Sequence, residues 1–215
     1  MKNKRVVVIV DYGMGNILSV KRAIEECGGK AVVSSDADII LKSDKVILPG
    51  VGAFGQAVHQ LNNFHLFDAL KEVSLKGNDL FGICLGMQLL FTRSEEFGEH
   101  NGLDIIKGSV ELISRKGKQN SNIKVPHIGW KKLIPITGMG DCEGLFNNIK
   151  SNDYFYFVHS FMGAPSSRSN IIFNALYEEI EIPAVVKRDS IIGCQFHPEK
   201  SGTAGLKIIK NWIKK

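Results

Sequence analysis

The chain has 215 residues, 44% of them hydrophobic, and a formal net charge of +5. This length and composition suit a single domain over residues 1–215, and no apolar stretch approaches the roughly 18 to 20 residues that a membrane-spanning helix needs. The charge does not indicate a nucleic-acid-binding protein, because Lys and Arg are spread along the chain. The one dense cluster, at residues 207–215, alternates with apolar residues at helical spacing.

The first residues superficially resemble a signal sequence, with a basic start followed by an apolar run. That run covers only Val6 to Val10 before Asp11 ends it, and no small-residue cleavage site follows. The cysteines form no C-x-x-C pair and have no clustered histidines, which argues against a zinc site and against a secreted disulfide framework. They are Cys27, Cys84, Cys142 and Cys194. We therefore expect a cytoplasmic protein without a metal site.

In the first half of the chain, short β-branched runs alternate with helical patterns. Strands are expected at residues 5–10, 30–34, 45–48 and 80–84. Helices are expected at 16–27, at 36–41 with Ser35 or Asp36 as the cap, from the turn after residue 48 to about 76, and from 85 onward. This alternation predicts an α/β fold with a parallel sheet covered by helices on both faces.

The second half of the chain is richer in short strands and turns. Strands are expected at residues 109–114, 132–136, 153–158, 171–177, 184–188 and 191–196. The segment around Asp189 and Ser190 predicts a hairpin between the last two of them. A final helix is expected from about Ser201. No internal repeat or linker divides the chain.

The strongest local feature is the segment Gly82-Ile83-Cys84-Leu85-Gly86, in which an expected strand ends at a cysteine and a helix follows at once. Such a G-x-C-x-G turn raises the thiol above the edge of a sheet, and the helix N-terminus favours the thiolate. The backbone N–H of Leu85 would then point toward a developing oxyanion. The alternative is a small buried residue between two glycines, because free cysteines are commonly core residues.

His197 is the best candidate for a base, because it follows an apolar strand in the segment Q-F-H-P-E. Parallel strands end at one edge of a sheet, so a histidine at one strand end can face a cysteine at another. Glu199 could orient the imidazole and complete a Cys–His–Glu triad. A loop histidine before a proline is the alternative. His59, His65 and His100 are expected to be surface residues.

A glycine-rich turn, Pro49-Gly50-Val51-Gly52, follows the third expected strand. Its backbone N–H groups could bind an anion and provide a second oxyanion donor beside Leu85. A tight strand-to-helix turn would also be rich in glycine and proline without any function.

Together, the glycine-rich turn, the segment G-I-C-L-G-M-Q and the late H-P-E resemble class I (triad) glutamine amidotransferases. The resemblance implies a flavodoxin-like α/β domain that hydrolyses L-glutamine without a cofactor. It implies that Cys84 is the nucleophile, that His197 is the base and that Glu199 orients it. Residues that would hold the substrate or the oxyanion are Val51, Gly52, Leu85 and Gln88.

Further segments are similar to the glutaminase subunits of imidazole glycerol phosphate synthases. These segments cover residues 11–16, 49–54, 86–90, 125–130, 156–160 and 195–201. The similarity implies a heterodimer with a separate (βα)8 cyclase, which would receive the ammonia during histidine synthesis. It also implies that Tyr156 and Ser160 line the glutamine pocket, with residues 11–16 and 126–130 near the partner. The chain shows no phosphate loop for an ammonia acceptor, which likewise predicts a partner.

Two departures from that pattern fall where the chain could contact its partner. Lys131 stands where these subunits usually have Asn, and residues 160–163 are less aromatic. Two other functions stay open: a related glutaminase that supplies a sugar amidotransferase in surface-polysaccharide synthesis, and a stand-alone γ-glutamyl hydrolase. A nucleotide-binding module is disfavoured, because the third glycine of G-x-G-x-x-G would fall at Leu18. A non-catalytic scaffold would not need all three triad residues.

Overall fold

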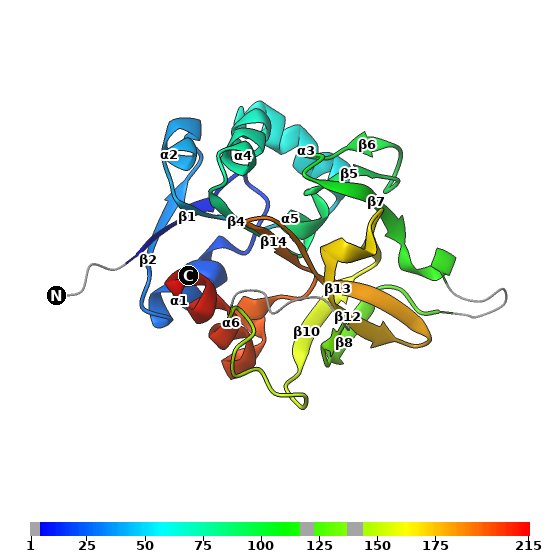
Figure 1. The fold of residues 1–215 in the computed structure, drawn as a ribbon. Helices are drawn as coiled ribbons and strands as arrows, with labels where there is room; N and C mark the ends of the chain where they lie inside the picture. The colour runs from blue at the N-terminus through cyan, green and yellow to red at the C-terminus, as the bar shows by residue number, and fades with distance from the viewer. Residues whose placement is uncertain (1–4, 117–122, 137–143) are drawn as a thin grey trace.

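A large mixed sheet runs through the middle of the computed structural model, which describes residues 5–116, 123–136 and 144–215 (Figure 1). Cys142 lies outside these ranges. Within them the sheet has eight strands in the order β2-β1-β3-β4-β14-β13-β12-β9. Their bounds are β1 (Val6–Val10), β2 (Lys30–Ser34), β3 (Lys45–Leu48), β4 (Asp79–Ile83), β9 (Ile134–Pro135), β12 (Ile171–Tyr177), β13 (Ile180–Arg188) and β14 (Ile191–Cys194).

The first five strands in this order, β2, β1, β3, β4 and β14, are parallel to one another. The remaining strands, β13, β12 and β9, continue the sheet in antiparallel pairs. The parallel part has the 2-1-3-4-5 order of flavodoxin-like sheets, in which ligands bind at the carboxyl ends of the strands. A two-residue turn at Asp189 and Ser190 joins β13 to β14, with Asp189 in the left-handed region at φ 53°. The predicted hairpin and the predicted, mainly parallel α/β sheet are both confirmed.

Helices cover both faces of the parallel part (Figure 1). On β1, Val7 and Ile9 pack with residues of α1 and α6, whereas Val8 and Val10 pack with residues of α2, α3 and α4. This division follows from the strand geometry, in which successive side chains point to opposite faces. The helices are α1 (Ile17–Glu26), α2 (Ala37–Leu41), α3 (Phe54–Asn63), α4 (Leu66–Leu75), α5 (Leu85–Gln88) and α6 (Gly202–Lys214).

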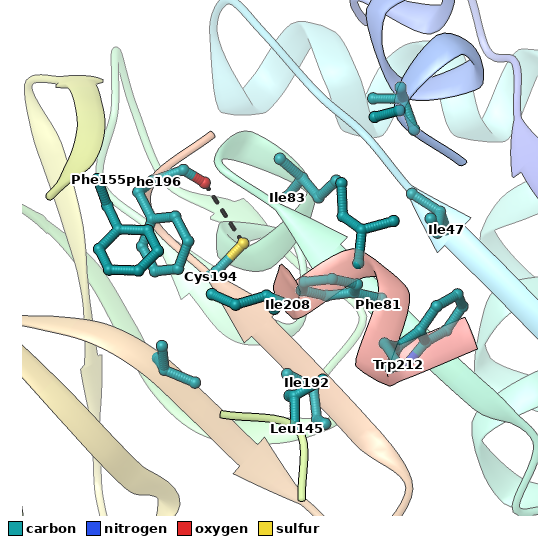
Figure 2. Close-up of a cluster of buried hydrophobic side chains, with 14 of the residues drawn as sticks. Ile47, Phe81, Ile83, Leu145, Phe155, Ile192, Cys194, Phe196, Ile208 and Trp212 are labelled. Atoms are coloured by element: carbon teal, nitrogen blue, oxygen red, sulfur yellow. Dashed lines mark hydrogen bonds between the residues drawn. The ribbon is translucent and has the colours of Figure 1, made fainter. Parts of the chain in front are cut away.

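The core under α6 contains some of the largest buried side chains of the protein (Figure 2). Trp212 of α6 packs on Phe81 of β4 with ring centroids 5.5 Å apart, and Ile208 lies in the same cluster. The apolar positions of the C-terminal segment therefore face the sheet, as their helical spacing predicts. Within the described ranges, no helix has both the length and the apolarity of a membrane span.

Two smaller sheets stand beside the large one and carry one wall of the site described below. One has the strand order β11-β7-β5-β6 and the other pairs β10 with β8. Their bounds are β5 (Phe91–Ser94), β6 (His100–Asn101), β7 (Ile106–Leu112), β8 (His127–Lys131), β10 (Phe155–His159) and β11 (Phe161–Pro165). Short 3-10 helices occur at η1 (Ile113–Lys116), η2 (Arg168–Asn170) and η3 (Pro198–Lys200).

Two helix predictions need correction. The single helix expected up to residue 76 is divided into α3 and α4, because His65 adopts a left-handed backbone at φ 56°. Asn62 and Asn63, which are weak helix formers, precede this break. The helix expected from residue 85 onward has only four residues, because the chain turns back into β5. Asp36, rather than Ser35, caps α2 by accepting from the N–H groups of its first turn.

Candidate active site

Cys84 occupies the sharp turn between β4 and α5. Its backbone is at φ 54° and ψ −109°, a conformation that costs energy in a residue with a side chain. The turn is held by the Cys84 N–H, which donates to the carbonyl of Cys194 on the neighbouring strand at 2.8 Å. The side chain is 7% exposed. Such a strained, well-anchored turn is the arrangement expected of a nucleophile elbow.

The glycines around Cys84 allow backbone segments to approach one another closely. A Cβ at Gly86 would lie 1.8 Å from the Leu48 carbonyl oxygen, and a Cβ at Gly82 would lie 2.7 Å from the Gly86 oxygen. A Cβ at Gly50 would lie 2.9 Å from the Gly86 nitrogen. The glycine-rich turn after β3 is therefore pressed against the start of α5, so that Val51 and Leu85 line the same cavity.

A cavity of about 260 Å³ opens above Cys84. Every expected site residue except Glu199 and Tyr156 lines this cavity. Its lining also includes four residues that were not predicted as site residues: Glu96, Val158, His159 and Phe161. The lining residues that were expected are Val51, Gly52, Cys84, Leu85, Gln88, Ser160 and His197.

Glu199 lies directly behind His197, outside the cavity. Its Oε1 is 2.8 Å from His197 Nδ1, and the two side chains are only 1% and 2% exposed. Burial by itself would lower the pKa of His197, but Cys84 and Glu199 outweigh burial and raise that pKa to about 10. His197 Nε2 has no hydrogen-bond partner among the described residues. Cys84 therefore raises the pKa of His197 through the attraction between a thiolate and the protonated imidazole. A protonated imidazole beside a thiol favours the nucleophilic thiolate.

Tyr156 does not line the cavity, contrary to expectation. It lies on β10 two residues before Val158, and its ring packs against Trp130 of β8 with centroids 5.6 Å apart. The physical reason is register: Tyr156 and Trp130 are paired across the β8–β10 ladder, which draws the two aromatic side chains together. Its backbone carbonyl accepts from the N–H of His197 at 2.9 Å. Tyr156 thus supports the triad segment from behind.

The remaining histidines divide by burial. His59 and His65 are exposed, as expected, but His100 is half-buried against Gly55, whose added Cβ would lie 2.5 Å from the His100 ring. His127 and His159 are buried and contact each other, with 3.0 Å between Nδ1 and Nε2. Among the described residues, no group of three or more His, Cys, Asp or Glu side chains is placed to hold a metal ion.

A buried pair of glutamines connects the cavity wall to the sulfur. Gln88 Nε2 donates to the Phe161 carbonyl at 2.9 Å and to Gln195 Oε1 at 3.1 Å, and Gln195 Nε2 lies 3.8 Å from Cys84 Sγ. Gln195 stands in the segment Q-F-H-P-E, but its contact with Cys84 depends on strand register. No local sequence pattern indicates that contact.

Comparison with known proteins identifies the family of this chain. The sequence model of the class-I glutamine amidotransferase family matches residues 8–215. Subunit HisH 1 of imidazole glycerol phosphate synthase from Legionella pneumophila strain Paris is 42% identical over 96% of this chain and 98% of its own length. The HisH subunit from Carboxydothermus hydrogenoformans is 48% identical over 95% of this chain and 96% of its own.

Solved structures support the fold. The structure of PurLQS from Thermotoga maritima matches with a TM-score of 0.70 over 98% of each chain, although only 18% of the residues are identical. The family model and the extent of the sequence identity together determine the assignment. The chain belongs to the class-I glutamine amidotransferases and, within them, to the HisH subunits of imidazole glycerol phosphate synthase.

Proposed function

We propose that this chain hydrolyses L-glutamine at Cys84 and supplies the released ammonia to a synthase subunit in histidine biosynthesis. The observation that carries the proposal is the assembly of Cys84 and His197 in one cavity, with Glu199 2.8 Å behind His197. Its reaction is glutamine and water giving glutamate and ammonia. The single domain over residues 1–215 and a cytoplasmic location form part of the proposal.

In the first half of this reaction, the Cys84 thiolate attacks the side-chain amide carbon of glutamine. A C–S bond forms, and the negative charge moves to the amide oxygen, where the N–H groups of Leu85 and of the Val51 turn would stabilise it. Collapse of this intermediate breaks the C–N bond. His197 donates its proton to the departing nitrogen, so that ammonia leaves and a glutamyl thioester remains.

In the second half, His197 accepts a proton from water, which attacks the thioester and releases glutamate and the thiolate. Glu199 holds the imidazole ring in the orientation needed for both transfers. Glu96 supplies negative charge to the cavity, and we assign it to the α-ammonium group of glutamine. Its Oε2 also accepts from the N–H of Phe54 at 2.6 Å, which fixes the carboxylate at the start of α3.

For the partner, we propose a (βα)8 cyclase in a heterodimer. The names of the similar proteins describe them as synthase subunits. Ile128 and Trp130 of β8 are 59% and 52% exposed, and these two large apolar side chains lie in the segment expected to face the partner. Lys131 belongs to the same strand and places its Nζ 5.4 Å from the centroid of the Tyr177 ring.

The test is the Cys84→Ala variant, assayed for glutamate release in the presence of the cyclase subunit. We expect at least a roughly 10³-fold loss, because no other group would form the thioester. Cys27→Ala provides the matched control, since this half-buried thiol donates to the Leu206 carbonyl away from the cavity. Normal turnover by Cys84→Ala would show that the triad assignment is wrong.

A further inference from the structure

Gln195 is a buried amide beside the Cys84 sulfur that the triad does not account for. Its side chain is 0% exposed, and its Nε2 lies 3.8 Å from Sγ. Strand register places it there, because Cys194 pairs with Ile83 in the parallel β4–β14 pair and the Cys84 N–H donates to the Cys194 carbonyl. Gln195, which follows β14, is therefore held beside Cys84, which follows β4.

The orientation of this amide is determined by a chain of hydrogen bonds that begins at a backbone carbonyl. The Phe161 carbonyl can only accept, so the Gln88 amide must turn its nitrogen toward it, and the same nitrogen faces Gln195. Gln195 must then present its oxygen to Gln88 and its nitrogen to Cys84. A flipped Gln195 would set two donors against each other and its oxygen against the sulfur.

We propose that Gln195, oriented by Gln88, donates a hydrogen bond to the thiolate of Cys84 and so stabilises the nucleophile. This inference rests on the proposed function, in which Cys84 attacks glutamine. A thiolate is a stronger hydrogen-bond acceptor than a thiol, so an N–H donor favours the ionised form. Because Gln195 is buried, water does not compete for this donor. Gln88 is then a positioning residue in addition to its expected contact with the substrate.

A purely structural role would leave the chemistry of the sulfur unchanged. In that case the two amides would only tie α5 to β11 and to the segment after β14, and removing Gln195 would lower stability without altering Cys84. The two roles are therefore separated by a measurement on the sulfur itself, made without glutamine and without turnover.

The experiment follows alkylation of Cys84 by iodoacetamide as a function of pH, with the modified peptide identified by mass spectrometry. Gln195→Met keeps the length of the side chain and removes its donor. We expect the pH midpoint of alkylation to rise by about one unit. The titratable groups around the sulfur stay in place: His197, His159, Glu199, Tyr12, Cys194 and Glu96.

A second variant and a control complete the design. Gln195→Glu keeps the shape and the oxygen that faces Gln88, but it sets a carboxyl group against the sulfur, so the midpoint should rise at least as far. It also serves if Gln195→Met fails to fold. Asn174→Leu removes another buried amide, one that donates to Glu181 away from the cavity, and it should leave the midpoint unchanged.

The inference is wrong if the folded Gln195 variants alkylate with the midpoint of Asn174→Leu. That result would leave the proposed function intact, provided that Cys84→Ala is still inactive. Full activity of Cys84→Ala would instead overturn the proposed function. The failure of one idea is therefore distinguishable from the failure of the other.

Discussion

At the scale of single residues, the buried pair His127 and His159 shows how packing determines protonation. His159 Nδ1 lies 2.8 Å from the Phe161 carbonyl, which can only accept, so this nitrogen carries the proton. His159 Nε2 must then accept from His127 Nδ1. His127 Nε2 is left as an unprotonated acceptor without a hydrogen-bond partner among the described residues, and the ring lies between Tyr177 and Phe157.

This pair should make the protein sensitive to acid. Burial is the main cause that lowers the pKa of His127 to about 4 and that of His159 to about 3. These values lie below the pKa of an unfolded histidine, which is near 6.5. At a pH between the folded and the unfolded pKa, the unfolded chain therefore binds more protons than the folded protein. The contribution of the pair is thus complete above about pH 6.5 and is lost as the pH falls through about 4 for His127 and about 3 for His159. Each proton taken up on unfolding contributes a slope of about 1.4 kcal/mol per pH unit.

His127→Phe tests this expectation, because it keeps an aromatic ring between the neighbouring rings and removes one titrating group. The free energy of unfolding is measured with urea between pH 4 and 7. Its slope against pH should be smaller by about 1.4 kcal/mol per pH unit, which corresponds to one proton. His59→Phe is the control, since this exposed side chain is in water before unfolding. An unchanged slope in His127→Phe would contradict the assignment.

At the scale of elements, the β4–α5 turn depends on close backbone packing at Gly86. A methyl group there would meet the Leu48 carbonyl oxygen at 1.8 Å, and backbone at the end of β3 cannot move aside cheaply. We expect Gly86→Ala to lower the free energy of unfolding by at least about 3 kcal/mol and to abolish glutamate release.

Gly77→Ala separates this effect from simple loss of a glycine. Gly77 is at φ 76°, but nothing lies within 4 Å of its added Cβ. Its replacement should therefore cost only about 1 kcal/mol of backbone strain and leave activity unchanged. Equal losses of stability in the two variants, measured by denaturant unfolding, would show that packing against β3 does not limit the turn.

The elements also show which parts of the fold were predictable. Strands β2, β3 and β12 match their predicted bounds, because continuous β-branched runs ended by turn residues give a strong local signal. Strands β5, β6, β8 and β11 were not predicted, and the strand expected at 132–136 is reduced to the two-residue β9. These short strands are stabilised by pairing with distant segments, which a local pattern does not reveal.

At the scale of the whole molecule, the cavity is built from two parts that differ in how well the sequence predicts them. The carboxyl ends of β3, β4 and β14 bring the glycine-rich turn, Cys84 and His197 to one edge of the sheet, as parallel topology requires. The facing wall, residues 158–161, is formed by the end of β10 and the start of β11, which belong to the two smaller sheets. Its position depends on pairing across the chain, which is why His159 and Phe161 were missed.

The exposed aromatic surface beside this cavity leads to a prediction about assembly. Trp130 is 52% exposed, and it packs on Tyr156, whose carbonyl accepts from the His197 N–H. A partner that contacts Trp130 would thus be separated from the triad segment by a single strand, β10. Trp130→Ala should weaken binding of the cyclase subunit at least about 10-fold, because exposed aromatic residues often dominate interfaces.

Titration calorimetry with the purified cyclase subunit measures this binding, and thermal unfolding of the free chain measures stability. Leu75→Ala is the matched control, since Leu75 is 86% exposed at the end of α4, on the helical layer that covers the sheet. Binding should be weakened in Trp130→Ala alone, and the melting temperature of both variants should stay near that of the parent. Equal affinity of the two variants would place the partner on another surface, and β8 would then be exposed for some different reason.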